Sequence, residues 1–549
     1  MVVHVQLVEP GLYAAIQGIA GLYALLANCN RVNAFITPII DLSDPGLFGN
    51  DAAEDETPEL LSSYFVEKAE FRRFYSVNTP LAIVRARKGI GKSALLAHVA
   101  HQVRTGDRKT VVVQVKGSDL TGMGEFLSSD PSVLVNQWQQ VICSQINVEI
   151  GRRVGFAFTD TSMALVESAE LAGFRSRNLV GALIERLKVK AKFDHAEVDI
   201  VKPPAGKPSY LLDNFARENK GVNVWVVVDD IDATFTNSDQ MRVKAATFFS
   251  ACRKLVSDVQ GVRIRAAVRT DVWTEIRRTD EALDKCEQYI VDLAWDRDEI
   301  STIILMRVLS YLRRLQPDNP RFQRWTLGRQ SSKISDLIFP AMVKWGEFVI
   351  PTPHAISRLA VNRPRWATQL CRLSGSHAHR LGTKIDMNSI WEALPRFGQL
   401  RLDDLYREHG HQFAHLQSLI ECFADGYRRY TTAELTRWIT KRMRIDTSHL
   451  SDDPGLQLNG NRISRVLELC HFLYKIGFIY GVKQQSDELG HYTYYEDRPE
   501  LLQNPSNVDD GLIWEIDASY RKVLRIKRDY HPNHDRKSKS TATLDPNQP

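Results

Sequence analysis

Four short apolar runs, separated by stretches with helical spacing, constrain this sequence more than any other feature. They are LAIVR (81–85), TVVVQV (110–115), VNVWVVVD (222–229) and VRIRAAV (262–268). Continuous apolar runs of this kind are expected of parallel strands that are covered on both faces. Strands that alternate with helices predict an α/β fold, with a doubly wound parallel sheet sandwiched by helices.

The segment after the first run has the spacing of a phosphate-binding P-loop. It reads Ala-Arg-Lys-Gly-Ile-Gly-Lys-Ser (86–93) and precedes the helical stretch SALLAHVAHQV. Small residues let backbone N–H groups surround phosphate oxygens, and the helix N-terminus adds partial positive charge. Lys92 would reach the β- and γ-phosphates, and Ser93 would ligate Mg²⁺. The predicted nucleotide-binding residues here are Ala86, Gly89, Ile90, Gly91, Lys92, Ser93 and Ala94.

The third apolar run ends in acids, as VVVDDID at 226–232. A hydrophobic strand that ends in two carboxylates is the expected partner of a P-loop. Asp229 would hold the Mg²⁺ shell, and Asp230 would orient or deprotonate the attacking water. Acids at strand ends are common, so this motif indicates a nucleotide site only in combination with the P-loop. Lys92 and Asp230 are therefore the predicted catalytic residues, and Ser93 and Asp229 the predicted metal ligands.

Three polar clusters further along are candidates for contacting phosphates. Arg-Thr-Asp at 269–271 ends the fourth run and could sense the γ-phosphate, with an ordinary strand-to-loop cluster as the alternative. Arg277 and Arg278 could act in trans as an arginine finger, although a solvated helix face is the simpler interpretation. Asn-Arg-Pro-Arg at 362–365 precedes a helical run, where Arg365 could reach the phosphates and couple a lid to nucleotide state. A surface turn is the alternative there.

Cysteine and histidine usage bounds the remaining chemistry. The seven Cys are scattered and never spaced C-x-x-C, which argues against a disulfide framework or zinc ribbon and fits a reducing cytoplasm. His409, His411 and His415 lie close together but lack neighbouring Cys and ligand spacing, so no metal site is predicted there.

Net charge and hydropathy are uneven at the two ends. The formal charge is +5, and the stretch from Arg521 onward holds eight Lys or Arg and three Asp, so the first 520 residues sum to zero. This cationic tail is expected to be disordered and either touches phosphates or has no function. Residues 10–30 carry no charge. An amphipathic or loosely packed extension is favoured for them over a membrane span.

The carboxyl-terminal third has the pattern of a winged helix. HLQSLIECFAD, TTAELTRWITKRM and NRISRVLELCHFLYKIGF predict three helices, and GFIYGVKQ and HYTYYED predict a β-wing. In a DNA-binding domain, Arg462, Ser464 and Arg465 near the start of the third helix would meet the major groove. The opposing Glu468 and the acidic turn at 487–488 favour docking to a protein instead.

These motifs together resemble AAA+ and STAND-type bacterial ATPases, including the initiator-like class with a helical lid and a winged helix. The resemblance rests on the P-loop, the Asp-Asp strand, the Arg-Thr-Asp strand end, YIVDLAWDRDEISTIILMRVL (289–309) and Asn-Arg-Pro-Arg, and covers about 45–380. The opening FGNDAAEDETPELLSSYFVE is similar to a group of largely uncharacterised bacterial P-loop ATPases. The resemblance implies an ATP-driven switch, often in regulation or in defence against mobile elements. The second acid is Asp230 rather than the Glu usual in AAA+ proteins, which argues against fast hydrolysis.

The expected organisation is an N-terminal extension (1–44), a P-loop ATPase core (45–296), a helical lid (297–400), a winged-helix domain (401–520) and a basic tail (521–549). The predicted function is a cytoplasmic molecular switch that binds ATP with Mg²⁺ and hydrolyses it. The alternative is a nucleic-acid-binding regulator that uses ATP as a slow or structural ligand. A homo-oligomer and a DNA or protein partner stay open, and a scaffold with a vestigial P-loop is the least favoured hypothesis.

Overall fold

The computed structural model describes residues 40–527, with gaps at 107–109, 123–125, 154–211, 216, 218–222, 233–234, 236–237, 278–280, 347, 447–455, 484–491, 496 and 504–508. The uncharged stretch 10–30 and most of the basic tail lie outside the described residues. Among the helices that are described, none is both long and apolar enough to span a membrane.

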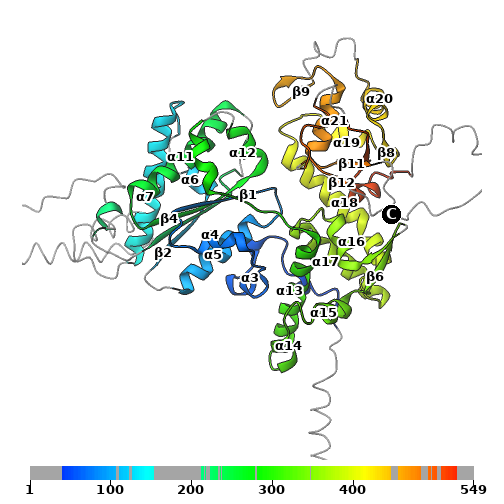
Figure 1. Cartoon of the computed structure of the whole chain (residues 1–549), viewed down its shortest axis with the longest axis horizontal. Coiled ribbons are helices and arrows are strands. Elements are labelled where there is room, and N and C mark those ends of the chain that lie inside the picture. Colours follow the sequence, from blue (N-terminus) through cyan, green and yellow to red (C-terminus); the bar gives the residue numbers. More distant parts are fainter. Residues whose placement is uncertain are drawn as a thin grey trace, which may run out of the picture.

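A five-stranded parallel sheet forms the centre of the first domain, in the order β2-β3-β4-β1-β5 (Figure 1). Its strands are β1 (Leu81–Ala86), β2 (Val111–Lys116), β3 (Val224–Asp229), β4 (Val262–Arg269) and β5 (Ile290–Asp292). All four apolar runs are therefore confirmed as strands, within two residues at each end. Because the strands are parallel, their carboxyl ends meet at one edge of the sheet, where the P-loop follows β1.

Alternate residues of each strand pack into two different cores. Leu81 and Ile83 join the core beneath α7 and α11, whereas Ala82 and Val84 join the core shared with α5 and the lid. Figure 1 shows helices on both faces of the sheet. They are α5 (Lys92–Gly106), α6 (Gly117–Gly122), α7 (Pro131–Arg153), α11 (Asp239–Asp258), α12 (Thr270–Arg277) and the 3₁₀ helix η3 (Glu281–Tyr289). The doubly wound fold predicted from the sequence is confirmed.

The segment before the sheet consists of short helices. They are α2 (Pro45–Phe48), η1 (Ala53–Asp55), α3 (Pro58–Tyr64), η2 (Ala69–Phe71) and α4 (Arg72–Tyr75). The apolar residues over 59–76 have helical spacing, yet the chain there forms three separate short helices rather than one. Phe65 ends α3 with an extended backbone and stacks on His98, and Phe71 packs edge-on against Trp295. These tertiary aromatic contacts of Phe65 and Phe71 override the local helical pattern.

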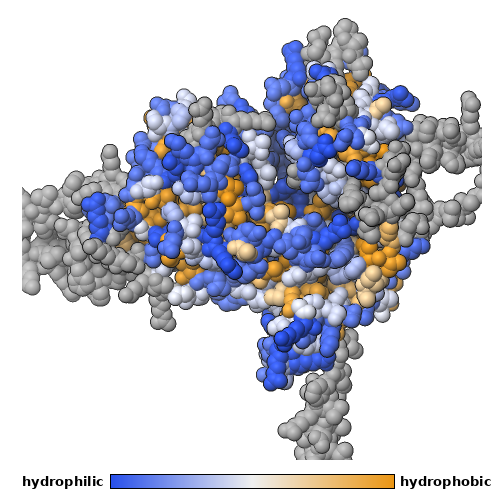
Figure 2. Space-filling view, in the orientation of Figure 1, coloured by the Kyte–Doolittle hydropathy of each residue, from blue (hydrophilic) through white to orange (hydrophobic). Residues whose placement is uncertain are grey.

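The next region is mainly helical, as expected of a lid. It comprises α13 (Arg297–Leu315), α14 (Pro320–Arg324), α15 (Ser331–Ile338), α16 (Thr352–Leu359), α17 (Pro364–Leu381) and α18 (Met387–His409). The sequence missed a hairpin of β6 (Met342–Trp345) and β7 (Phe348–Pro351), which turns at Gly346 with φ +61°. Figure 2 shows an apolar patch over β6, where Met342 and Val349 are exposed. Helix α18 continues through the expected lid boundary at residue 400.

The last domain combines helices with small antiparallel sheets. Its elements are α19 (Leu416–Glu421), β8 (Arg429–Tyr430), α20 (Thr432–Met443), β9 (Gln457–Leu458), β10 (Asn461–Arg462), α21 (Val466–Lys475), β11 (Ile479–Lys483), β12 (Tyr492–Thr493), β13 (Leu512–Ile516) and α22 (Ala518–Arg521). The four-stranded sheet has the order β12-β11-β13-β8. This helix-and-wing arrangement confirms the winged-helix fold, although β13 was not predicted.

The third helix of this domain begins later than predicted. Asn461 and Arg462 belong to β10, which pairs with β9, and α21 starts only at Val466. Ser464 and Arg465 precede the helix, where their N–H groups donate to Glu468 Oε1 at 3.0 and 3.1 Å. The prediction that Arg462, Ser464 and Arg465 lie on a recognition helix is therefore wrong.

The first residues of the expected tail belong to the folded domain. Glu515 on β13 is fully buried and accepts from Arg428, Arg429 and Arg521. Burial alone would raise the pKa of Glu515, but the charges of Arg521, Arg428 and Arg429 lower it to about 2. The chain stays attached as far as Lys527, whose N–H donates to the Gly426 carbonyl.

Candidate nucleotide site

The P-loop connects β1 to α5 at the carboxyl edge of the sheet. Gly89 and Gly91 adopt φ values of +79° and +112°, a region that favours glycine. Lys92 is the first residue of α5 and is largely buried. Its Nζ donates to the carbonyls of Ala86 and Arg87 at 3.2 and 3.4 Å. The lysine therefore lies inside the turn of the loop, as the motif predicts.

The loop carbonyls at 88–90 are held by residues outside the loop, two of them in the lid. They accept in turn from Arg363 Nη1 (3.2 Å), the Arg365 N–H (3.3 Å) and Trp295 Nε1 (2.7 Å). Within the described part of the chain, the N–H groups of residues 88–91 donate to no protein acceptor. The donors that surround a phosphate are available, and the lid fixes the peptide planes that carry them.

The carboxylates at the end of β3 lie beside the start of α5. The Ser93 hydroxyl hydrogen-bonds Asp229, and the Asp230 N–H donates to Asp229 Oδ1 at 3.0 Å. Burial, and then the charge of Asp230, raise the pKa of Asp229 to about 6. One carboxylate oxygen each of Glu54, Asp229 and Asp230 lies within 4.8 Å of the others. Hydroxyl and carboxylate oxygens are the ligands Mg²⁺ prefers, so this donor set fits the ion.

The Arg-Thr-Asp segment at the end of β4 faces the lid. Arg269 forms a two-point ion pair with Asp271, and its N–H donates to the buried Asp232 at 2.5 Å. His409 at the end of α18 lies against this group. Burial lowers the pKa of His409 to about 4, which keeps the imidazole neutral at physiological pH. The cluster thus joins the sheet edge to α18.

The predicted lid arginine does lie on the P-loop. A Cβ placed on Gly89 would be 3.5 Å from Cβ of Arg365, and Arg365 Nε is buried without a hydrogen-bond partner. Its neighbour Arg363 packs on one side of Trp366, which Arg401 also contacts through its guanidinium. Burial lowers the pKa of Arg363 to about 10, still well above neutrality. Two cationic side chains are therefore held at the mouth of the loop.

The winged-helix domain also touches the loop. Arg87 Nη2 donates to the carbonyl of Lys475, the last residue of α21, at 3.4 Å. Lys475 in turn pairs with Glu275 on α12 at 3.9 Å. Lys88 pairs with Asp404 on α18 at 3.7 Å. All three domains therefore meet around residues 87–90.

Other predicted residues lie elsewhere. Arg277 is paired with Glu287 at 3.1 Å on its own domain, and Arg278 lies outside the described residues. His415 caps the start of α19, where its ring packs edge-on against Phe413. Ala94 continues the first turn of α5 behind the P-loop.

Sequence reasoning missed Glu54 and Lys116. Lys116 ends β2 directly beside Asp229 in the sheet, and its Nζ pairs with Glu54 Oε2 at 3.4 Å. Lys116 directly follows an apolar run that was predicted as a strand, whereas Glu54 comes from a turn-rich stretch with no local signal. Trp295 lies within the stretch 289–309 that carries the resemblance, but its hydrogen bond to the loop was not predicted.

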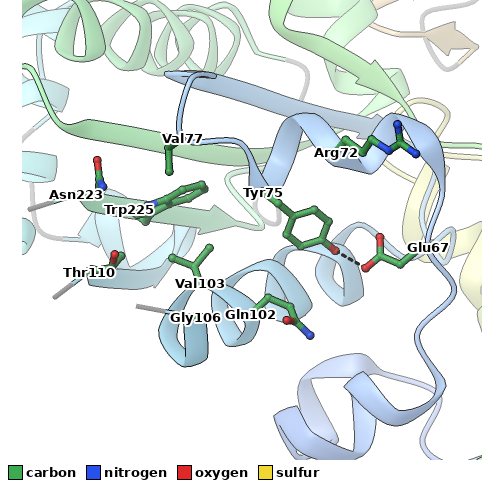
Figure 3. Close-up of a pocket in the computed structure, with 10 residues that line it drawn as sticks. All are labelled: Glu67, Arg72, Tyr75, Val77, Gln102, Val103, Gly106, Thr110, Asn223 and Trp225. Carbon is green, nitrogen blue, oxygen red and sulfur yellow. Dashed lines mark hydrogen bonds between the residues drawn. The ribbon is translucent and has the colours of Figure 1, made fainter. Parts of the chain in front are cut away.

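A separate cavity of about 510 Å³ opens at the opposite edge of the sheet (Figure 3). Thr110 and Asn223, which line it, precede β2 and β3, whereas the P-loop follows β1. Figure 3 shows Tyr75 directed at Glu67, with a hydrogen bond of 2.9 Å. The cavity therefore does not belong to the candidate nucleotide site.

Comparisons with known proteins give no close relative. No family model matches the chain, and no curated protein matches it. The Aeropyrum pernix ORC2 protein, in its ADPNP–ADP complexes, superposes with a TM-score of 0.39 and 12% identity, over 88% of this chain and 96% of that one. Its ADP form gives a TM-score of 0.33 and 11% identity over the same shares. Similarity at this level assigns neither a family nor an activity to the chain.

Proposed function

We propose that this chain binds ATP with Mg²⁺ at the P-loop, hydrolyses it, and converts the nucleotide state into a change of lid and winged-helix position. The observation that carries the proposal is the loop itself. Among the described residues, the N–H groups at 88–91 donate to no protein acceptor, while the carbonyls of residues 88 and 89 accept from the lid and that of Ile90 accepts from Trp295. This is the arrangement that a phosphate chain requires.

The roles of the individual groups follow from their positions. Lys92 sits inside the loop, from which its ammonium can exchange two carbonyl partners for phosphate oxygens. Ser93 and Asp229 would hold Mg²⁺, with Asp230 beside them. When bound, Mg²⁺ neutralises phosphate charge and favours the departure of the diphosphate. Arg365 would meet the phosphates from the lid.

The contacts of the loop with the rest of the chain support a switch. Arg363 and Arg365 reach it from the lid, and Arg87 reaches the end of α21 in the winged helix. A phosphate bound to the same loop would weaken or strengthen these contacts. Occupancy of the site would therefore change the positions of the lid and the winged helix. We infer a regulatory or defence setting from the resemblance to ATPases of that type.

Nucleotide binding is tested by calorimetry with ATP and Mg²⁺. Lys92→Ala should weaken affinity by more than tenfold, about 1.4 kcal/mol or more, because the loop loses its buried cation. Lys254→Ala, an exposed lysine on α11, is the matched control and should bind as the parent chain does. Equal affinity in Lys92→Ala would overturn the proposal.

A nucleic-acid-binding regulator is the second candidate. Arg462 and Arg465 are exposed just before α21, where a phosphate backbone could reach them. Duplex binding by such a surface weakens steeply as salt rises. Affinity unchanged in Arg462→Glu with Arg465→Glu, and in a chain ending at residue 527, would reject it. Turnover measured with and without duplex DNA then separates a DNA-coupled switch from one that docks a protein.

A further inference from the structure

Helix α20 of the winged-helix domain carries a row of exposed cations. Arg437, Lys441 and Arg444 follow one another at intervals of four and three residues, so their side chains lie on one side of the helix. In the described part of the chain none of the three forms an ion pair. Glu434, the one acid of α20, is used in the capping box with Thr431 at the opposite end of the helix. Figure 1 shows α20 on the side of the domain away from α16 and α17, so the row faces solvent.

The last described residues extend this row. The N–H of Lys527 donates to the Gly426 carbonyl at 2.8 Å, and Arg525 pairs with Asp425 at 2.7 Å. Hydrogen bonding from Arg525, and then the charges of Lys527 and Arg442, lower the pKa of Asp425. One carboxylate therefore faces three cations, and the positive charge of the row is not cancelled there. We call the exposed cations on this side the α20 surface: Arg437, Lys441, Arg442, Arg444, Arg525 and Lys527.

The next helix, α21, is closed to a DNA groove. The Tyr474 hydroxyl donates to the carbonyls of Tyr494 and Arg498 at 2.6 and 3.2 Å, and His471 Nδ1 lies 2.9 Å from the Leu501 carbonyl. The chain between β12 and β13 thus covers α21, and every residue of this helix is buried or partly buried. Side chains on α21 therefore cannot reach base edges, which is how a groove is read.

The composition of the α20 surface selects one class of partner. The exposed residues of α20 include no large apolar side chain. A helix that lies on a membrane needs an apolar face to enter the lipid, and a protein interface is centred on apolar or aromatic anchors. Single-stranded nucleic acid is held on exposed aromatic platforms, which this surface also lacks. A row of arginine and lysine alone matches the phosphates of a duplex, to which arginine can donate two hydrogen bonds.

We propose that the α20 surface binds the phosphate backbone of duplex DNA without reading its sequence. The inference goes beyond the proposed nucleotide switch, because it uses no residue of the P-loop. It also differs from a contact through Arg462 and Arg465, which lie on β10 and just before α21. Affinity at such a surface comes from the release of counterions, so its dependence on salt counts the phosphates that are contacted.

Fluorescence anisotropy tests the proposal with the full-length chain, without nucleotide, and short labelled duplexes of two unrelated sequences. The two duplexes should bind within about threefold of each other, because no side chain reads the bases. Combining Arg437→Ala, Lys441→Ala and Arg444→Ala should reduce the slope of log affinity against log salt by about 2.7, since each phosphate contact contributes about 0.9. Between 50 and 200 mM salt the parent should then lose about 40-fold more affinity than the variant does.

The matched control combines Arg324→Ala, Arg329→Ala and Lys333→Ala. These residues are exposed on the lid, and their removal takes away the same residue types and the same net charge. The control should keep the salt slope of the parent, so a loss confined to the α20 variant reports position and not total charge. If the triple α20 variant does not fold, as judged by thermal unfolding, Lys441→Ala alone should reduce the slope by about 0.9.

Several outcomes would overturn the proposal. They are an unchanged salt slope in the α20 variant, an equal loss in the control, and a strong preference for one of the two sequences. Phosphatidylserine vesicles and a polyglutamate peptide are the parallel probes. Binding to either of them without binding to the duplex would replace DNA by a membrane or an acidic protein as the partner. Lys92→Ala should bind the duplex as the parent does, so a failure of nucleotide binding leaves this inference standing.

Discussion

Asp229→Asn should stabilise the nucleotide-free protein at neutral pH, even though Asp229 is a proposed Mg²⁺ ligand. Burial and the neighbouring Asp230 raise its pKa from 3.8 to about 6. The difference of 6 − 3.8, about 2 units, corresponds to about 3 kcal/mol at 1.36 kcal/mol per unit. This is an upper bound, because the Ser93 hydroxyl loses an ionised acceptor.

The sign of the pH dependence follows from linkage. Because the folded pKa of this acid is raised, the folded state binds the proton more tightly than the unfolded state does. The stability that Asp229 contributes is therefore present below about pH 4 and is lost as pH rises through 6. The ionised carboxylate costs about 3 kcal/mol above pH 7, and about half of that at pH 5.

Thermal unfolding of parent and variant at pH 5.0 and 7.5, followed by tryptophan fluorescence, measures the effect. Asp229→Asn should raise Tm by up to about 6–12 °C at pH 7.5, and by about half as much at pH 5.0. Saturating ATP with Mg²⁺ should stabilise the parent by about 2.7 kcal/mol at 100 times Kd and the variant by far less. Asp258→Asn, at the exposed end of α11, should change neither value. A variant that is less stable than the parent at pH 7.5, or a gain that does not depend on pH, would refute the reasoning.

Two structural predictions follow from the packing. Glu515→Gln should destabilise the winged-helix domain by about 3 kcal/mol at pH 7, because three arginines lose their buried counter-charge. The deficit in urea unfolding should shrink as pH falls from 4.5 towards 2, the range over which Glu515 itself loses its stabilisation. Equal stability at pH 7 would contradict this. Gly117→Ala should displace the turn after β3, since its Cβ would lie 2.2 Å from Cα of Ile231. Calorimetry should then show weakened Mg²⁺-dependent ATP binding, whereas Gly106→Ala, with open space around its Cβ, should bind as the parent does.

Local patterns in the sequence were enough for the sheet and the P-loop. The apolar runs identify four strands because a parallel strand that is buried on both faces is a continuous apolar run in its own sequence. The P-loop follows directly, since its glycines, Lys92 and Ser93 are neighbours in sequence. The β6–β7 hairpin carried a weaker signal, an alternation of buried and exposed residues on either side of Gly346, and it was missed.

Contacts between distant segments could not be read in this way. Glu54 comes near Asp229 on a turn that Asp51 anchors to α17 and that Asn50 closes on itself, and no spacing in the sequence encodes these contacts. The start of α21 was misplaced because residues 461–462 pair with β9 instead of joining the helix, although Ile463 continues the apolar spacing of the helix. Arg521 is likewise held by Glu515, which lies on β13, a strand that was not predicted.

Because Arg87 on the P-loop bonds to the last residue of α21, the domains of this protein cannot be separated without breaking contacts at the P-loop. Truncation near residue 400 would cut through α18 and leave Arg87, Lys88 and Glu275 without the partners they have in the intact chain. A fragment ending there would expose a cationic loop that the whole molecule covers, and its affinity for any anion would rise for reasons unrelated to nucleotide recognition. Biochemical dissection is therefore better done with point variants in the full-length chain than with isolated domains.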